Sequence, residues 1–169
     1  MKIESFGRLY QPINKIEIKS TRNPVDLYKM MKMYSQERKE IFPWIHAVLN
    51  CIDTMLCNCK MRIVKDDCGN LLASYTYKFI KNEFGQKSMY LDALVRNRKR
   101  QESKNVINYI YKDMKKIATD KQAKELTLYS KVNEKELRRK YEQLGFKNDE
   151  RNSIEKAYFM RVPTIDFLY

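Results

Sequence analysis

The fold of this chain is decided by the stretch Val95-Arg-Asn-Arg-Lys-Arg100-Gln-Glu-Ser103-Lys-Asn105-Val-Ile-Asn-Tyr-Ile-Tyr111. Five of the nine residues from Arg96 to Lys104 are basic, an apolar segment precedes them, and regularly spaced apolar residues follow. The pattern predicts a strand, a basic loop and an amphipathic helix. Such a loop suits a phosphate group, because the first N–H groups of a helix lack partners within it and the helix dipole is positive there. The alternative is a solvated turn in a chain that is basic throughout.

Three strands are expected before this loop. The segments 61–65 and 71–81 are joined by a turn that contains Gly69-Asn70, which is typical of a hairpin. Apolar residues alternate along the second segment, and this places one set on a common face: Ala73, Tyr75, Tyr77 and Phe79. The third segment, 89–95, is almost entirely apolar, which favours a central strand with both faces covered.

The N-terminal part is predicted to hold one strand, at 13–19, and two helices. Asn23-Pro24 opens the first helix, with the proline at the first helical position and Asp26 in the first turn. The second helix, at 44–57, has an apolar stripe that includes Ile52 and Leu56.

The C-terminal half is predicted to alternate helices with strands. The helix after the basic loop carries one apolar stripe, made of Val106, Ile107, Ile110, Met114, Ile117 and Ala118. A strand is expected at 125–129, and a second at 157–162. Between them, Asn133 is expected to cap a helix that ends at Leu144, with Gly145 as its C-terminal stop.

These elements predict a single α/β domain over residues 1–169, in the order β-αα-βββ-α-β-α-β. The sheet is expected to be mixed and mostly antiparallel, flanked by helices, with its core at 13–162 and an apolar C-terminal tail at 163–169. A strand, a helix and the next strand form a right-handed crossover. Ligands in such sheets lie beyond the strand ends where the strand order changes, which is where the basic loop is expected.

Composition limits the classes of function. The chain has 169 residues, 43% of them hydrophobic, and a formal net charge of +13, which favours a globular protein with an anionic partner. The sequence contains neither an apolar run of about 18 residues nor an apolar signal core, so we expect no membrane span and a cytoplasmic location. Cys57 and Cys59 are too close for a usual zinc motif and no histidine lies near them, so we expect no metal.

A motif near the C-terminus carries a resemblance to a known family. Residues 133–146 read Asn133-Glu-Lys-Glu-Leu-Arg-Arg-Lys-Tyr141-Glu-Gln-Leu-Gly145-Phe146. This resembles the ending shared by the GNAT superfamily of N-acetyltransferases, in which an Asn leads a helix that closes with Tyr-Glu-x-Leu-Gly-Phe. The predicted order of elements is similar to that family's order as well. The resemblance implies direct transfer of an acetyl group from acetyl-CoA to an amine.

The family's cofactor loop, Arg/Gln-x-x-Gly-x-Gly/Ala, is matched less well. Counted from Val95, its Arg position falls on Arg100 and its two glycine positions fall on Ser103 and Asn105; counted back from the helix, the loop falls at 102–107. Glycine permits positive φ and a close approach of phosphate, so its absence predicts a weakened, remodelled or lost cofactor site. The resemblance assigns the following residues to the cofactor: Leu94, Val95, Arg96, Arg98, Arg100, Ser103, Lys104, Asn105 and Asn133.

Two residues are implied to be catalytic. Tyr141 matches the family's tyrosine, and a phenol, which has an unperturbed pKa of about 10, can protonate a departing thiolate at neutral pH. The alternative for Tyr141 is a core position on an amphipathic helix. Asp92 lies where the family often has an acid, and it is implied to act as the base or to position water; the alternative is a salt bridge. For Asn133, a helix N-cap is the alternative to cofactor contact.

Four aromatic residues are candidates for contact with the acyl acceptor. In the family, the first helix pair covers the acceptor side, and this implies Trp44 and His46. Tyr75 and Tyr77 are candidates if they line the acceptor cleft. Packing in the core is the alternative for all four residues.

The leading hypothesis is an N-acetyltransferase that uses acetyl-CoA and an unknown acceptor amine. The charge favours an acidic or nucleic-acid-linked acceptor, such as an aminoacyl-tRNA, over a cationic polyamine. A second hypothesis is a catalytically inactive GNAT-like module that binds nucleic acid or a protein through its basic surface. A third is a structural protein or homodimer that uses the tail Ile165–Tyr169 as its contact.

Overall fold

The computed structural model describes residues 15–37, 52, 56, 59–100, 103, 105–155 and 157–164, with the backbone alone at 34–37. Its strands form one sheet of seven, in the order β1-β2-β3-β4-β5-β7-β6. The elements in chain order are β1 (Glu17–Ser20), α1 (Pro24–Glu37), β2 (Lys60–Lys65), β3 (Leu71–Lys81), β4 (Lys87–Arg96), α3 (Val106–Asp120), β5 (Glu125–Lys131), α4 (Lys135–Gln143), β6 (Lys147–Asn148), the 3-10 helix η2 (Glu150–Asn152) and β7 (Ala157–Pro163).

The sheet is mixed, and β4 lies at its centre. Strands β4 and β5 are parallel, whereas every other neighbouring pair is antiparallel. The parallel pair is joined by α3, as the predicted crossover requires. The predicted fold class, a single α/β domain with a mostly antiparallel sheet flanked by helices, is therefore confirmed.

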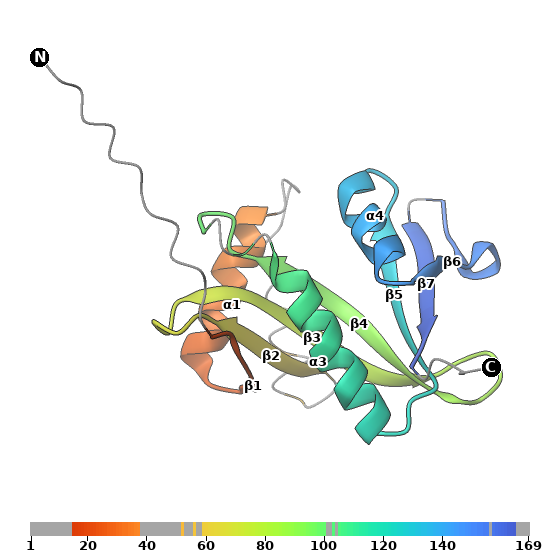
Figure 1. Ribbon diagram of the computed structural model, residues 1–169, viewed down its shortest axis with the longest axis horizontal. Helices are drawn as coiled ribbons and strands as arrows, with labels where there is room; N and C mark the ends of the chain where they lie inside the picture. Colours follow the sequence, from red (N-terminus) through yellow and green to blue (C-terminus); the bar gives the residue numbers. More distant parts are fainter. Residues whose placement is uncertain are drawn as a thin grey trace, which may run out of the picture.

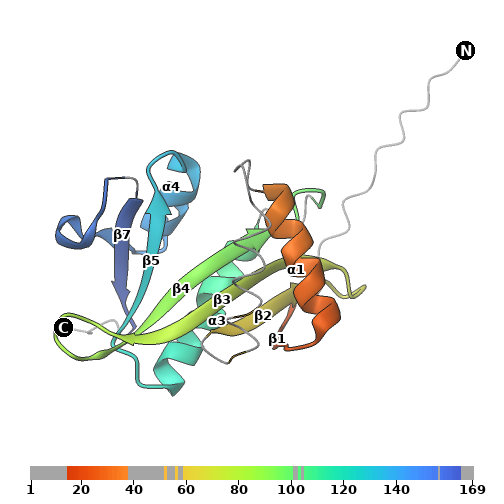
Figure 2. The same ribbon diagram turned by 180° about the vertical axis from the view of Figure 1, so that it is seen from behind.

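Helices cover both faces of the sheet. Helix α3 crosses the face that is in front in Figure 1, and α1 crosses the opposite face, which Figure 2 shows from behind. The core under α3 and α4 includes buried residues from β3, β4, β5 and β7. A smaller core under α1 combines Leu27, Met30 and Met33 with Met61 and Ile63 of β2 and with Val95 of β4.

Helix α1 begins where the sequence predicted. The Oδ1 atom of Asn23 accepts a hydrogen bond from the Val25 N–H at 2.9 Å, so a side chain satisfies one of the free N–H groups of the first turn. Pro24 is the first helical residue. Strand β1 differs from its prediction, since it pairs with β2 only from Glu17 to Ser20. Of the predicted second helix, only Ile52 and Leu56 belong to the described residues, and both are exposed, whereas the sequence predicted them on its apolar stripe.

Helix α3 is fixed to the sheet by apolar packing and by one partly buried ionic network. Its predicted stripe is confirmed, because four of its members are buried: Val106, Ile110, Met114 and Ala118. Near the middle of the helix, Asp113 pairs with Arg62 of β2, with Nε 2.7 Å from the carboxylate. The Tyr75 hydroxyl of β3 donates a short hydrogen bond to the same carboxylate. The network therefore joins α3 to β2 and β3.

Helix α4 starts later than predicted and ends at Gln143, with the predicted last residue Leu144 as its C-cap. It begins at Lys135 with Glu134 at the N-cap, so Asn133 lies one residue before the cap and its predicted capping role is wrong. At the other end Gly145 adopts φ +91°. The Gly145 N–H then donates to the Glu142 carbonyl at 2.9 Å, and the Phe146 N–H donates to the Tyr141 carbonyl at 3.0 Å. This is a Schellman motif, and it needs the positive φ that glycine adopts without strain.

The short elements β6 and η2 were not predicted. They are too short for a periodic pattern, and their stability comes from one buried carboxylate. Asp149 accepts hydrogen bonds from the Arg151 N–H at 3.2 Å and from the Asn152 side-chain amide at 2.8 Å. It also accepts a short hydrogen bond from Arg161 of β7. The segment between α4 and β7 is thus fixed by its contact with β7.

Candidate active site

The two parallel strands at the centre of the sheet separate before they end. Their pairing runs from Ser88–Glu125 to Leu91–Leu128 and stops there. Strand β4 nevertheless continues to Arg96, and β5 continues to Lys131. Figure 1 shows the resulting V between β4 and β5, with α4 beside its open end. One edge of β4 therefore faces open space instead of a neighbouring strand.

A β-bulge lies at the point of separation. On β3, Tyr77 is opposite Leu91 and the preceding residue Thr76 is opposite Ala93, so Asp92 is the extra residue on β4. A bulge bends its strand and turns a side chain away from its regular direction, and bulges are frequent beside active sites. Here the bulge places the Asp92 side chain beside the opening between the strands.

The separation creates a groove of about 670 Å³. Its walls come from β4, the loop after it, the first turn of α3, the end of β5, one side of α4 and the residues around the start of β7. Five basic side chains line it: Arg96, Arg98, Lys131, Lys135 and Lys140. Three acidic side chains line it: Asp92, Glu134 and Glu136. Among the residues that the structure describes, the lining of the groove therefore carries a net positive charge.

Tyr141 lies on α4, belongs to the core under α3 and α4, and lines the groove from that side. Only 5% of it is exposed, and its ring packs against Phe146 with the centroids 5.7 Å apart. It lines the same groove as Asp92. The structure therefore brings together the two residues that the sequence named as acid and base, although they come from different elements. Tyr141 is at once a core residue and a groove residue.

The Asp92 carboxylate already has a cationic partner. Its Oδ1 atom is 3.3 Å from the Lys78 ammonium of β3, and the Cys59 thiol donates to Oδ2 at 4.0 Å. The salt bridge named as the alternative for Asp92 is thus present, in the wall of the groove. Beside it, burial and the negative charge of Asp92 raise the pKa of Tyr90 to about 12.

Six of the residues assigned to the cofactor line the groove, namely Leu94, Val95, Arg96, Arg98, Ser103 and Asn133. The Ser103 side chain is 1% exposed, and its hydroxyl lies 2.8 Å from the Asn97 carbonyl and 2.7 Å from the Arg100 carbonyl. Its hydrogen bonds close the basic loop on itself. Ser103 therefore shapes the loop, and its hydroxyl is already used by the backbone.

Arg100 turns away from the groove. Its guanidinium donates to the Asn70 Oδ1 atom at 2.8 Å, on the turn between β2 and β3, and it is not among the groove-lining residues. The predicted phosphate contact of Arg100 therefore has no support in this geometry, because the hairpin turn holds the side chain. Lys104, which was assigned to the cofactor as well, lies outside the described residues.

The basic loop does without the glycines of the family pattern. Asn105 precedes α3 with φ −101°, exposes its side chain and makes no side-chain capping bond. In the part of the chain that the structure describes, Gln122 is the one non-glycine residue with positive φ. Neither Ser103 nor Asn105 therefore uses the left-handed backbone that would require glycine.

The four acceptor candidates fall into two groups. Tyr75 and Tyr77 are buried in the core under α3, and neither is among the groove-lining residues. The core position named as their alternative is what the structure shows. Trp44 and His46 lie outside the described residues, so their contact with an acceptor stays a prediction. Sequence patterns missed Tyr90, Tyr129 and Lys131 in the groove, because only the separation of β4 from β5 exposes them there.

Solved structures share this architecture. A spermidine N-acetyltransferase from Vibrio cholerae, in complex with CoA and spermine, is 14% identical and matches with a TM-score of 0.64, covering 88% of this chain and 95% of that one. A GNAT-family acetyltransferase from Listeria monocytogenes is 12% identical, with a TM-score of 0.65 and coverage of 88% and 94%.

The chain has the GNAT fold. No protein-family model and no curated protein matches the sequence. At these identities the likeness to solved structures establishes the fold and leaves the activity to be argued from the groove.

The shape and charge of the groove suit an extended, anionic ligand. The side of β4 that no longer pairs with β5 offers backbone groups along Asp92–Arg96. Arg96 and Arg98 lie where β4 leads into α3, and cationic side chains there suit phosphate.

No helix in the described part of the chain is long and apolar enough to cross a membrane.

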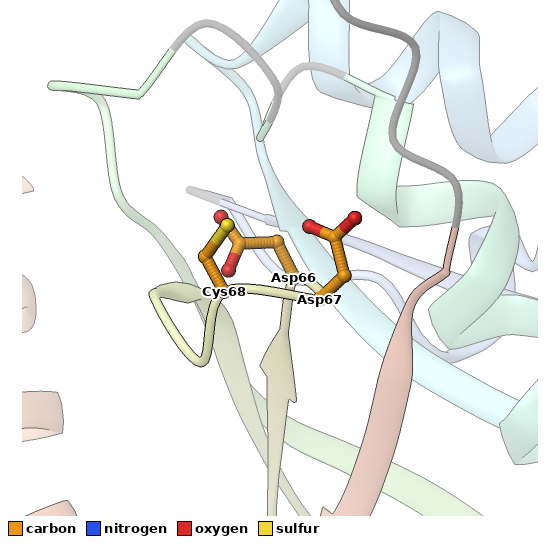
Figure 3. Close-up of side chains that lie close together, drawn as sticks. All are labelled: Asp66, Asp67 and Cys68. Atoms are coloured by element: carbon orange, nitrogen blue, oxygen red, sulfur yellow. The ribbon is translucent and has the colours of Figure 1, made fainter.

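A second group of polar side chains lies away from this groove. Asp66, Asp67 and Cys68 share the turn between β2 and β3, with their ligand atoms within 4.8 Å of one another (Figure 3). Asp66 accepts hydrogen bonds from the Asn70 N–H at 2.7 Å and from the Asn70 side-chain amide at 2.9 Å. The charge of Asp67 raises the pKa of the Cys68 thiol, which disfavours a metal-binding thiolate. These residues form the turn, and we assign no metal to them.

Proposed function

We propose that this chain is an N-acetyltransferase that moves the acetyl group of acetyl-CoA directly to an amine. The observation that carries the proposal is the coincidence of three features at one place. The central strands separate, the bulge residue Asp92 lies at the point of separation, and Tyr141 of the Tyr-Glu-x-Leu-Gly-Phe motif faces the same groove.

The groove residues divide into a binding set and a reacting set. The free edge of β4 at Leu94 and Val95 would hold the chain of the cofactor, and Arg96 and Arg98 would face its phosphates. Asn133 lines the groove just before α4 and would contact the same ligand. When bound, acetyl-CoA would supply a thioester whose carbonyl an amine can attack.

The reacting residues manage two protons. Asp92 would take the proton from the incoming ammonium, directly or through a water, while Lys78 holds the carboxylate at the bulge. Tyr141 would donate its Oη proton to the sulfur as the carbon–sulfur bond breaks, and the second proton that the amine nitrogen loses would restore the phenol. The two residues lie on β4 and α4, on different walls of one groove, so each can act on a different atom of the reaction.

The first experiment is calorimetry of acetyl-CoA binding to the purified protein. We expect a micromolar dissociation constant, equivalent to about −8 kcal/mol. Arg98→Ala should weaken binding about tenfold or more, since it removes a charged donor to phosphate. Lys99→Ala is the matched control, because it removes the same charge from the neighbouring exposed residue, which is not among the groove-lining residues. Absence of binding at millimolar cofactor would end the acetyltransferase proposal.

A binding module without catalysis is a second candidate function. The net charge of +13 and the basic lining of the groove support it, because both attract nucleic acid. The acceptor, a cytoplasmic location and a homodimer all stay predictions.

A further inference from the structure

One wall of the groove carries an aromatic side chain that is both exposed and held in place. Tyr129 of β5 lines the groove and is 42% exposed. Its ring contacts Phe159 of β7, with the centroids 5.0 Å apart, and Tyr90 of β4 at 6.2 Å. Its hydroxyl donates to the Asn152 carbonyl at 3.3 Å. A ring fixed in this way loses little conformational freedom when a ligand packs on it.

This aromatic group lies next to the expected site of proton transfer. Tyr90 connects Tyr129 with the bulge, because its ring contacts Tyr129 and it lies two residues before Asp92 on β4. A flat ring packed on Tyr129 would therefore bring an amine on a short linker toward the Asp92 carboxylate. Both residues line the same groove.

The same region is poorly suited to a polycation. The Lys78 ammonium lies 3.3 Å from the Asp92 carboxylate and 5.4 Å from the centre of the Tyr90 ring. One carboxylate and one ring face in this region therefore already hold a cation. The five basic and three acidic residues of the lining add a net repulsion. The Vibrio cholerae protein is named for spermidine, and the described lining of this groove has no excess of the acidic residues that a polycation favours.

We propose that the acceptor is a primary amine carried on a flat aromatic group, which packs on Tyr129 while its nitrogen approaches Asp92. The inference rests on the proposed function, because it assigns the acceptor class of that same groove. It makes Tyr129 a specificity-determining residue, supported from behind by Phe159 and Tyr90.

The test compares two amines of equal length that differ in ring flatness. Binding of 2-phenylethylamine and of 2-cyclohexylethylamine to the protein is measured by ligand-observed NMR, and kcat/KM for both is then measured with acetyl-CoA. We expect about a tenfold preference for the flat ring in both readouts, since aromatic contacts add to plain burial. Spermidine should be a poorer acceptor than either.

Variants assign the preference to one residue. Tyr129→Leu should abolish it, whereas Tyr129→Phe, which keeps the ring and loses the bond to Asn152, should retain it. Tyr109→Leu is the matched control, since Tyr109 is an equally exposed tyrosine on α3 that is not among the groove-lining residues. Equal binding of the two amines, or a preference for spermidine, would overturn the inference.

The outcomes separate this inference from the proposed function. If acetyl-CoA binds and is used but the flat ring has no advantage, the acceptor class is wrong and the enzyme proposal stands. If acetyl-CoA does not bind while 2-phenylethylamine binds through Tyr129, the enzyme proposal fails and the aromatic site stands.

Discussion

Tyr141 packs in the core and also lines the groove, and one substitution separates these two roles. Tyr141→Phe keeps the ring that packs on Phe146 and removes only the hydroxyl. If the hydroxyl is the general acid, turnover should fall about 10²- to 10⁴-fold. Acetyl-CoA affinity, measured by calorimetry, should change little. Full turnover in this variant at neutral pH would remove Tyr141 from the acid role.

Tyr90 predicts a loss of stability at alkaline pH. Burial and the nearby Asp92 carboxylate raise its pKa from 10.0 to about 12, so the folded protein keeps the phenol neutral. The contribution of the neutral Tyr90 phenol to the free energy of unfolding is complete below pH 10. It is lost as the pH rises toward 12, because the phenol of the unfolded chain releases its proton first. In that window each pH unit costs up to about 1.4 kcal/mol. In urea unfolding, the free energy of unfolding of Tyr90→Phe should therefore fall less steeply with rising pH than that of the wild type. Tyr109→Phe, on the exposed face of α3, is the control and should follow the wild type. Identical pH slopes for Tyr90→Phe and the wild type would refute this.

At the scale of elements, the Arg62–Asp113 pair holds α3 on the sheet. Arg62 also donates to the Ile18 carbonyl at 3.1 Å, so one guanidinium connects β1, β2 and α3. Asp113→Leu should lower the free energy of unfolding by about 3 kcal/mol, since it leaves the partly desolvated Arg62 guanidinium and the Tyr75 hydroxyl without their shared partner.

A double-mutant cycle in urea tests that reason. Arg62→Leu with Asp113→Leu should cost less than the two single changes added together, because neither charge is then left alone. The Tyr75 hydroxyl loses its acceptor both in Asp113→Leu and in the double variant, so this loss cancels from the coupling energy. Strict additivity of the two costs would show that the pair contributes no coupling to the attachment of α3.

At the scale of the whole molecule, the charge of +13 is spread along the chain. We expect any binding of single-stranded RNA to be driven by this spread charge, with log K falling linearly against log salt by about 0.7 per phosphate contact. Arg98→Ala should therefore change RNA affinity only slightly while it weakens acetyl-CoA binding. The opposite pattern, measured by fluorescence anisotropy and calorimetry, would identify the groove as a nucleic-acid site.

The tail 165–169 lies outside the described residues, and dimer formation through it stays a prediction.

The longer helices and strands could be predicted from contiguous stretches of sequence, because the periodic spacing of apolar residues repeats within one element. The alternation along 71–81 and the stripe along 106–118 both reappear as buried faces. Gly145 and the Tyr-Glu-x-Leu-Gly-Phe ending determined the C-terminal turn of α4 for the same local reason. The family resemblance and the fold class followed from such local signals together with their order.

The sequence named Asp92 and Tyr141, but only the tertiary structure decided how the site is assembled. The separation of β4 from β5 depends on where two distant strands stop pairing, and the bulge at Asp92 depends on the register with β3. Local sequence could not show that Lys78 pairs with Asp92, that Asn70 draws Arg100 away from the groove, or that Tyr129 is exposed in its wall. Each of these contacts joins residues from separate elements, so its geometry exists only once the chain is folded.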